Sequence, residues 1–153
     1  MSIIEAGAEL PEFTLRTADG EPFTNADLLG KTSVLVFYPY AFSGGCTNQL
    51  NAYEGALDEF AQRGATLYAI STDPRFSQAA FKESLGSSVE QLSDFEPKGA
   101  TARAFGAYFE PGGMTNRAVV IVGPDGVVKW SHLAPNPGEI PGVELIFEGL
   151  DAV

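Results

Sequence analysis

The chain has 153 residues, and its 20 Asp and Glu residues exceed its 9 Lys and Arg residues, for a formal net charge of -11. This balance excludes the usual nucleic-acid binders, which need clustered Lys and Arg, and it would repel an anionic membrane surface. No apolar run approaches the roughly 18 residues of a membrane span, and a hydrophobic share of 44% suffices for one compact domain over residues 1–153.

The first forty residues predict a hairpin and then a buried strand. Residues 13–16 and 21–23 are short extended segments around an Ala-Asp-Gly turn, and a short helical turn follows at 25–29. Val34 to Tyr38 form an uninterrupted run of β-branched and aromatic residues, typical of a strand buried on both faces of a sheet. We expect this strand to be central.

Residues 39–86 predict alternating helices and strands. Pro39 ends the central strand, and a helix is expected from Ser43 to a stop at Gly64, because apolar side chains recur at spacings of three and four. A strand at 66–71 and a second helix over 76–85 follow. This β-α-β-α succession favours a parallel sheet with right-handed crossovers. Four phenylalanines at helical spacings are expected in the core: Phe60, Phe76, Phe81 and Phe105.

The last third of the chain predicts a hairpin and a terminal helix. A short extended segment is expected at 89–92 and a helix at 98–105. Strands at 118–122 and 127–130 flank a Gly-Pro-Asp-Gly turn, and a helix over 143–150 follows. The whole pattern predicts an α/β fold with an N-terminal β-hairpin.

Cys46 is the only cysteine, and it lies where the central strand has turned into the following helix. The positive end of a helix dipole favours a thiolate, and the preceding Ser43-Gly44-Gly45 leaves the sulfur unobstructed. A lone cysteine is more often a small buried hydrophobe. Its position at the C-terminal end of a central strand, where open α/β sheets bind ligands, favours a reactive thiol. Because no intrachain disulfide can form, we expect a reducing, cytoplasmic compartment.

The segment from Pro39 to Cys46, Pro-Tyr-Ala-Phe-Ser-Gly-Gly-Cys, resembles the active-site loop of the peroxiredoxins, Pro-x-x-x-Thr/Ser-x-x-Cys. Arg117 starts a predicted strand, where that family carries its arginine, and the similarity extends from about Gly7 to Leu150. The chain is most similar to the one-cysteine, alkyl hydroperoxide reductase E-like group, whose arginine likewise follows an asparagine, here Asn116. The resemblance implies a thioredoxin-like fold, with a central mixed sheet flanked by helices, and a thiol peroxidase that needs no metal or cofactor.

The resemblance also implies roles for four catalytic residues. Cys46 would attack the terminal oxygen of hydrogen peroxide or an organic hydroperoxide as a thiolate and become a sulfenic acid. Arg117 would favour the thiolate and polarise the O–O bond. The Ser43 hydroxyl would bond the peroxide or the sulfur, and Pro39 would shield the sulfur from bulk water.

Three further residues are expected to contact the substrate or orient the arginine. The Gly45 amide would donate to an oxygen-rich ligand, and Phe42 would line the apolar mouth. Gln49 stands where many members have Glu, and its amide oxygen can still accept a hydrogen bond from the arginine. Ser43 replaces the commoner Thr but keeps the hydroxyl.

Regeneration of the thiol is expected to need an external reductant, because the chain has no second cysteine. A low-molecular-weight thiol, a glutaredoxin-like protein and thioredoxin all fit this role. A homodimer is expected by analogy with the family.

Two other functions fit the residues. A Cys-His hydrolase would use Cys46 with His132, the only histidine, and would need the imidazole within hydrogen-bond reach of the sulfur. A non-enzymatic thioredoxin-like binding module or holdase would show an inert, buried Cys46. Metal binding is disfavoured, because one His and one Cys do not make an ordinary ligand set.

Overall fold

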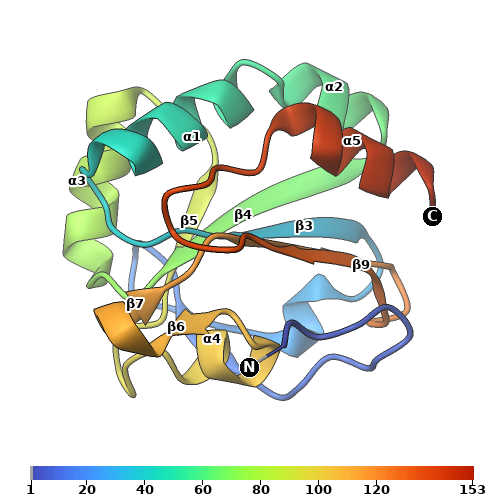
Figure 1. Cartoon of the computed structure of the whole chain (residues 1–153), viewed down its shortest axis with the longest axis horizontal. Coiled ribbons are helices and arrows are strands. Elements are labelled where there is room, and N and C mark those ends of the chain that lie inside the picture. Colours follow the sequence, from blue (N-terminus) through green and yellow to red (C-terminus); the bar gives the residue numbers. More distant parts are fainter. Residues whose placement is uncertain (1) are drawn as a thin grey trace.

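The computed structural model describes residues 2–153 and is built on one seven-stranded mixed sheet (Figure 1). The strand order is β2-β1-β5-β4-β3-β8-β9. The bounds are β1 Thr14–Arg16, β2 Pro22–Thr24, β3 Thr32–Phe37, β4 Ala65–Ser71, β5 Glu90–Ser93, β8 Ala118–Val122 and β9 Val128–Leu133. A separate two-stranded sheet pairs β6 (Tyr108–Phe109) with β7 (Met114–Thr115).

The central strand β3 pairs in parallel with β4 and antiparallel with β8. The parallel pairing follows from the helical crossover between β3 and β4, whereas the antiparallel hairpin of β8 and β9 extends the sheet on the other side. The predicted central strand and N-terminal hairpin are thereby confirmed. The hairpin joins the same sheet, because β1 pairs with β5.

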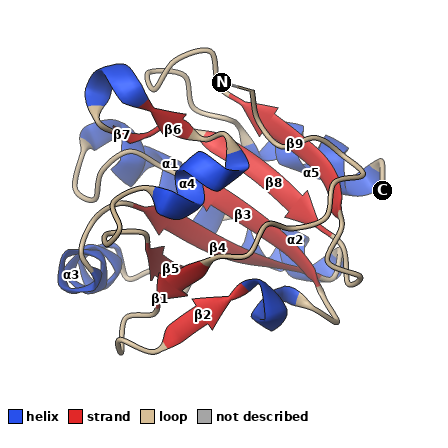
Figure 2. Cartoon of the chain, turned by 90° about the horizontal axis from the view of Figure 1, so that it is seen from below, coloured by secondary structure: helices blue, strands red, loops and turns tan. Residues whose placement is uncertain are grey.

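Helices cover both faces of the sheet. The bounds are α1 Gly44–Glu54, α2 Leu57–Gln62, α3 Arg75–Leu85, α4 Ala100–Phe105 and α5 Val143–Asp151, with 3-10 turns η1 at Asn25–Leu28 and η2 at Glu110–Gly112. In Figure 1, α1, α2 and α5 lie above the sheet and α4 lies below it, and Figure 2 shows α4 and the N-terminal segment on that lower face. The predicted α/β architecture with flanking helices is confirmed.

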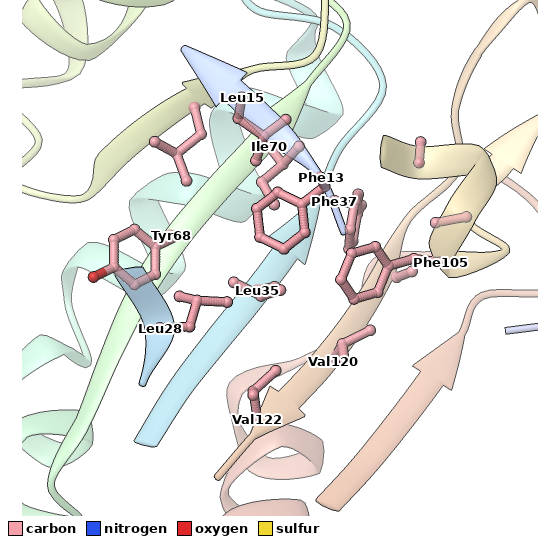
Figure 3. Close-up of a cluster of buried hydrophobic side chains, with 14 of the residues drawn as sticks. Phe13, Leu15, Leu28, Leu35, Phe37, Tyr68, Ile70, Phe105, Val120 and Val122 are labelled. Carbon is pink, nitrogen blue, oxygen red and sulfur yellow. The ribbon is translucent and has the colours of Figure 1, made fainter. Parts of the chain in front are cut away.

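The sheet separates two hydrophobic cores. Leu35 and Phe37 of β3 face the side of α4, where Phe105 packs at 5.5 Å from the Phe37 ring and at 5.8 Å from the Phe13 ring (Figure 3). The alternate residues of β3 face α1, α2, α3 and α5, in the cluster that contains Cys46. The continuous apolar sequence of β3 therefore reflects burial on both of its faces.

The helix predicted from Ser43 to Gly64 is interrupted, so that part of the prediction is wrong. Gly55 ends α1, and α2 starts at Leu57 after an irregular Ala56. Glycine is a poor helix former, which makes the interruption inexpensive there. The new direction of α2 places the Phe60 ring 4.9 Å from Phe147 of α5.

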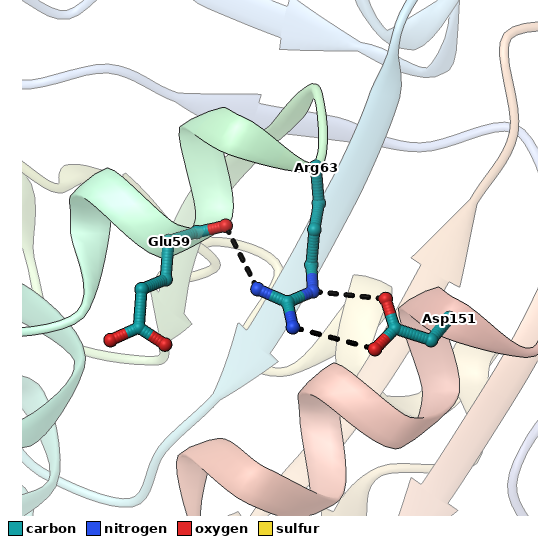
Figure 4. Close-up of polar contacts among 3 residues, drawn as sticks. All are labelled: Glu59, Arg63 and Asp151. Atoms are coloured by element: carbon teal, nitrogen blue, oxygen red, sulfur yellow. Dashed lines mark hydrogen bonds and ion pairs between the residues drawn. The ribbon is translucent and has the colours of Figure 1, made fainter.

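The end of α2 is also joined to α5 by polar contacts. Arg63 Nε lies 3.0 Å from Asp151 Oδ1, and its Nη1 donates to the Glu59 carbonyl at 3.1 Å (Figure 4). The Arg63 guanidinium also lies 4.1 Å from the centre of the Phe147 ring. These contacts hold α5 against the end of α2.

The prediction of core packing is confirmed for Phe60, Phe81 and Phe105 but is wrong for Phe76, which is 71% exposed. Phe76 and Phe81 lie five residues apart on α3, so their side chains point to different sides of the helix. Phe81 takes the core position, and the Phe76 ring lies under the Arg75 guanidinium at 4.1 Å.

Candidate active site

Cys46 lies in the first turn of α1, directly after the loop that follows β3. Ser43 is the N-cap residue, and its hydroxyl oxygen accepts a hydrogen bond from the Cys46 N–H at 3.1 Å. The Cys46 side chain is fully buried. Within residues 2–153 no side chain or backbone group accepts the hydrogen of the Ser43 hydroxyl, so that hydrogen is available to a ligand.

Arg117 reaches the thiol because of the strand register. Phe37, the last residue of β3, pairs with Ala118, the first residue of β8, so Arg117 lies beside the point where the chain leaves β3. Its Nη1 donates to the Cys46 sulfur at 3.3 Å, across 71 positions of sequence. Arg117 is 5% exposed, and the interaction therefore takes place in a poorly solvated environment where electrostatic attraction is strong.

The guanidinium is fixed by two neutral acceptors besides the sulfur. Nε donates to the Pro137 carbonyl at 2.6 Å, and Nη1 also donates to the Gln49 amide oxygen at 2.5 Å. The backbone of Arg117 is held as well, because its N–H donates to the Asn116 side chain at 2.8 Å. These contacts leave Nη2 without a hydrogen-bond acceptor within residues 2–153.

Gly45 lies against the free side of the guanidinium. A Cβ at this position would lie 2.7 Å from Arg117 Nη2, closer than carbon and nitrogen tolerate. The absence of a side chain at Gly45 therefore gives the guanidinium its space. The neighbouring Gly44 has no such constraint, because nothing lies within 4 Å of the same position.

Gln49 and Tyr53 continue the hydrogen-bonded network along α1. Gln49 Nε2 donates to the Tyr53 hydroxyl at 2.9 Å, and that hydroxyl donates to the Pro141 carbonyl at 2.7 Å. Burial raises the pKa of Tyr53 to about 12, against weaker opposing effects of the Gln49 hydrogen bond and the Arg117 charge. The phenol therefore stays protonated at neutral pH.

The segment that joins β9 to α5 closes the site. In Figure 1 this red segment passes beside α1, and its Pro137 and Pro141 carbonyls accept hydrogen bonds from Arg117 and Tyr53. Ile140 of the same segment comes within 3.9 Å of the Cβ position at Gly45. The site is thus assembled from α1, the start of β8 and this C-terminal segment.

The loop between β3 and α1 is anchored by Asp73. Its carboxylate accepts hydrogen bonds from the Ala41 N–H at 2.8 Å and from the Ser71 hydroxyl at 2.7 Å. Pro39, at the start of the loop, is buried. Phe42 has a left-handed backbone, with φ of 70°, and its ring packs 5.2 Å from Phe81.

The structure thus brings together Cys46, Arg117, Ser43, Gln49 and Gly45, whereas the Phe42 side chain is 56% exposed against α3. Tyr53 and Asp73 lie outside the set predicted from the sequence. Tyr53 shares the inner face of α1 with Cys46 and Gln49, at spacings of seven and four, and that periodicity could have identified it. For Asp73, the sequence signal is its place two residues after the end of β4.

His132 does not take the position that a Cys-His hydrolase requires. Its ring stacks on Trp130, with centroids 6.2 Å apart, and within residues 2–153 the hydrogen-bond partner of the sulfur is Arg117. Cys46 is buried, as a binding module would have it, but a guanidinium buried beside an inert thiol would lose hydration for no gain. In the same range, no group of three or more His, Cys, Asp or Glu side chains is placed to hold a metal ion.

Comparison with known proteins identifies the family. Residues 6–131 match the model of the AhpC/TSA family. The chain belongs to this family. It is 32% identical to alkyl hydroperoxide reductase E of Mycobacterium tuberculosis over 152 residues, which cover 99% of both chains. It is 33% identical to alkyl hydroperoxide reductase C of Amphibacillus xylanus over 135 residues, covering 84% of this chain and 71% of that protein.

Solved structures of AhpC/TSA proteins have the same fold. Peroxidoxin BcpB from Mycobacterium tuberculosis matches with a TM-score of 0.84 and 27% identity, covering 98% of both chains. AhpC from Enterococcus faecalis matches with a TM-score of 0.87 and 28% identity, covering 99% of this chain and 92% of that one. These comparisons confirm three predictions: the peroxiredoxin family, the thioredoxin-like fold and the enzyme class, a thiol-dependent peroxidase. No helix within residues 2–153 is long and apolar enough to cross a bilayer.

Proposed function

We propose that Cys46 reduces hydrogen peroxide and organic hydroperoxides as a thiolate held by Arg117. The observation that carries the proposal is the 3.3 Å hydrogen bond from the buried Arg117 guanidinium to the sulfur of Cys46, the only cysteine in the chain. The Cys46 position in the first turn of α1 adds the positive end of the helix dipole. Both effects favour the charged nucleophile over the thiol.

The chemical step is a displacement at oxygen. The thiolate gives an electron pair to the terminal oxygen of the hydroperoxide, the O–O bond breaks, and the leaving oxygen departs with its electrons as an alkoxide or hydroxide. Arg117 Nη2 and the Ser43 hydroxyl have hydrogens without an acceptor within residues 2–153, and they would stabilise the charge that grows on the leaving oxygen. Protonation of that oxygen gives alcohol or water, and Cys46 becomes a sulfenic acid.

Two equivalents of an external thiol complete the cycle. The first condenses with the sulfenic acid to a mixed disulfide and releases water, and the second attacks that disulfide and regenerates Cys46. The chain contains no other cysteine to do this. A low-molecular-weight thiol, a glutaredoxin-like protein or thioredoxin would each supply the electrons.

Pro39, Phe42, Gly45 and Gln49 are proposed to support this chemistry. Buried Pro39 keeps water from the sulfur, and Gln49 holds the guanidinium at 2.5 Å. Gly45 leaves space for the guanidinium, and its backbone N–H would face the substrate. Phe42 would form the apolar rim that an organic hydroperoxide meets first, since its ring is 56% exposed.

The decisive test is the rate at which reduced protein reacts with one equivalent of hydroperoxide. The single tryptophan, Trp130, offers a fluorescence signal, and thiol loss offers an independent one. We expect a rate thousands of times that of free cysteine, and no reaction in Cys46→Ser. A rate equal to that of free cysteine would overturn the proposal and favour a binding module.

A cytoplasmic homodimer is the proposed working form. Support for self-association comes from large apolar side chains on the surface, among them Phe42 at 56% and Phe76 at 71% exposure. A thiol that must remain reduced to react suits a reducing compartment. Sedimentation of the wild type and of Phe76→Glu tests the dimer, and a concentration-independent monomer in the wild type would refute it.

A further inference from the structure

We propose that Tyr53 is a positioning residue for the peroxidase reaction: its hydroxyl sets the orientation of the Gln49 amide, and hence which amide atom faces Arg117. The inference rests on the proposed function, because it concerns the same guanidinium. It adds a residue seven positions after Cys46 whose hydroxyl bonds to Gln49 and Pro141 rather than to the sulfur, and which acts on Arg117 through Gln49.

The direction of the hydrogen bonds follows from the Pro141 carbonyl. A carbonyl can only accept, so at 2.7 Å the Tyr53 hydroxyl must give its one hydrogen to it. The phenolic oxygen is then left as an acceptor and faces Gln49 Nε2 at 2.9 Å. The amide oxygen of Gln49 is thereby turned toward Arg117 Nη1, at 2.5 Å.

The opposite orientation of the Gln49 amide would occupy the same space but would be electrostatically unfavourable. It would direct the Gln49 NH2 group at Arg117 and set donors against donors. Arg117 would then lose an acceptor, and its hold on the Cys46 sulfur would loosen. Shape alone does not select the orientation, because the two ends of an amide are nearly the same size.

Burial makes the Tyr53 hydroxyl the deciding group. Tyr53 is fully buried and Gln49 is 1% exposed, so bulk water cannot take over the missing contact. The raised pKa of Tyr53, about 12, keeps its hydrogen in place throughout the neutral range. The orienting contact therefore does not titrate under working conditions.

The need for Tyr53 arises from the amide at position 49. A carboxylate accepts hydrogen bonds through both oxygens, so Gln49→Glu would face Arg117 with an acceptor in either orientation. Tyr53→Phe should accordingly matter in the Gln49 protein and not in the Gln49→Glu background. This dependence separates an orienting role from simple core packing, because a packing defect would persist in both backgrounds.

The test is a double-mutant cycle on the second-order rate constant with hydrogen peroxide, together with the pH dependence of Cys46 alkylation by iodoacetamide. We expect Tyr53→Phe to lower the rate constant about tenfold, the worth of one buried hydrogen bond, and to move the alkylation midpoint upward. In the Gln49→Glu background the same substitution should change neither. Tyr68→Phe is the matched control, since its hydroxyl meets Lys31 and its ring lies in the other core.

The outcomes distinguish this inference from the proposed function. A fast wild type with an unaffected Tyr53→Phe, or an equal loss in both backgrounds, would overturn the inference alone. A wild type as slow as free cysteine would overturn the proposed function and the inference with it. If Tyr53→Phe fails to fold, nuclear Overhauser effects in the wild type decide: Gln49 NH2 contacts to the Tyr53 ring support the orientation, and their absence overturns it.

Discussion

Substitution of Gly45 by alanine should separate the reactivity of Cys46 from the stability of the fold. The added Cβ would lie 2.7 Å from Arg117 Nη2, whereas ordinary contacts begin at 3.4 Å, so the guanidinium must retreat by about 0.7 Å. It cannot do so freely, because Pro137, Gln49 and the Cys46 sulfur hold its other nitrogens. At least one of those hydrogen bonds must lengthen beyond its useful range.

The magnitude follows from the value of a hydrogen bond to a charged group. Such a bond contributes about 1.5–3 kcal/mol, which corresponds to roughly a 10- to 150-fold loss in rate. The loss of stability should be smaller than this value, because alanine is favoured over glycine inside a helix by about 1 kcal/mol. That gain offsets part of the strain of the displaced arginine.

The assay is stopped-flow measurement of the hydrogen peroxide rate constant, paired with urea unfolding of the same samples. Gly44→Ala is the matched control: the residue is also in the first turn of α1, and nothing lies within 4 Å of its Cβ position. We expect Gly44→Ala to keep the wild-type rate. Equal rates in Gly45→Ala and Gly44→Ala would refute the claim that the guanidinium must stay where it is.

Three further predictions concern packing, capping and pH. Phe105→Ala should destabilise the protein by about 3–5 kcal/mol, because it removes the ring that fills the core below the sheet, and urea unfolding measures this. Ser43→Ala should lose about 1 kcal/mol of unfolding free energy through the missing N-cap, and Ser43→Thr should keep it. Burial alone would raise the pKa of Glu54, but hydrogen bonds from Ser87 and Ser88 lower it below its ordinary 4.5. The stability that the Glu54 carboxylate adds is thus fully present above pH 4.5, and it is lost as the pH falls through the lowered pKa of Glu54. The difference in unfolding free energy between wild type and Glu54→Gln should shrink in acid.

Local patterns were enough to predict the sheet and the position of the thiol. Three of these patterns depend on residues that are close in sequence: the apolar run of β3, the glycines before Cys46 and the turn between β8 and β9. Phe76 shows the limit of such reasoning. Its helical spacing predicts a place in the core, but the packing of α3 determines which apolar residue of that helix faces the core.

The contacts around Arg117 could be foreseen only in part. A resemblance placed Arg117 near Cys46, and the register of β3 with β8 explains why they meet. The Pro137 and Pro141 carbonyls belong to a segment without periodicity, whose path depends on where α5 docks. The helical spacing of Gln49 and Tyr53 places both on one face of α1, but the bond from Tyr53 to that segment follows from tertiary structure.

The acceptors around Arg117 are neutral, which favours a negative charge on a neighbouring group. Within residues 2–153 its side chain donates to the Pro137 carbonyl, the Gln49 amide oxygen and the Cys46 sulfur, and none of them is a carboxylate. A buried cation without a counter-ion is costly, and the cost falls when a neighbouring group becomes negative. Within this set only Cys46 can do so by losing a proton. An amide at position 49 therefore orients the guanidinium without neutralising it, and leaves its charge available to the thiolate that we propose attacks the peroxide.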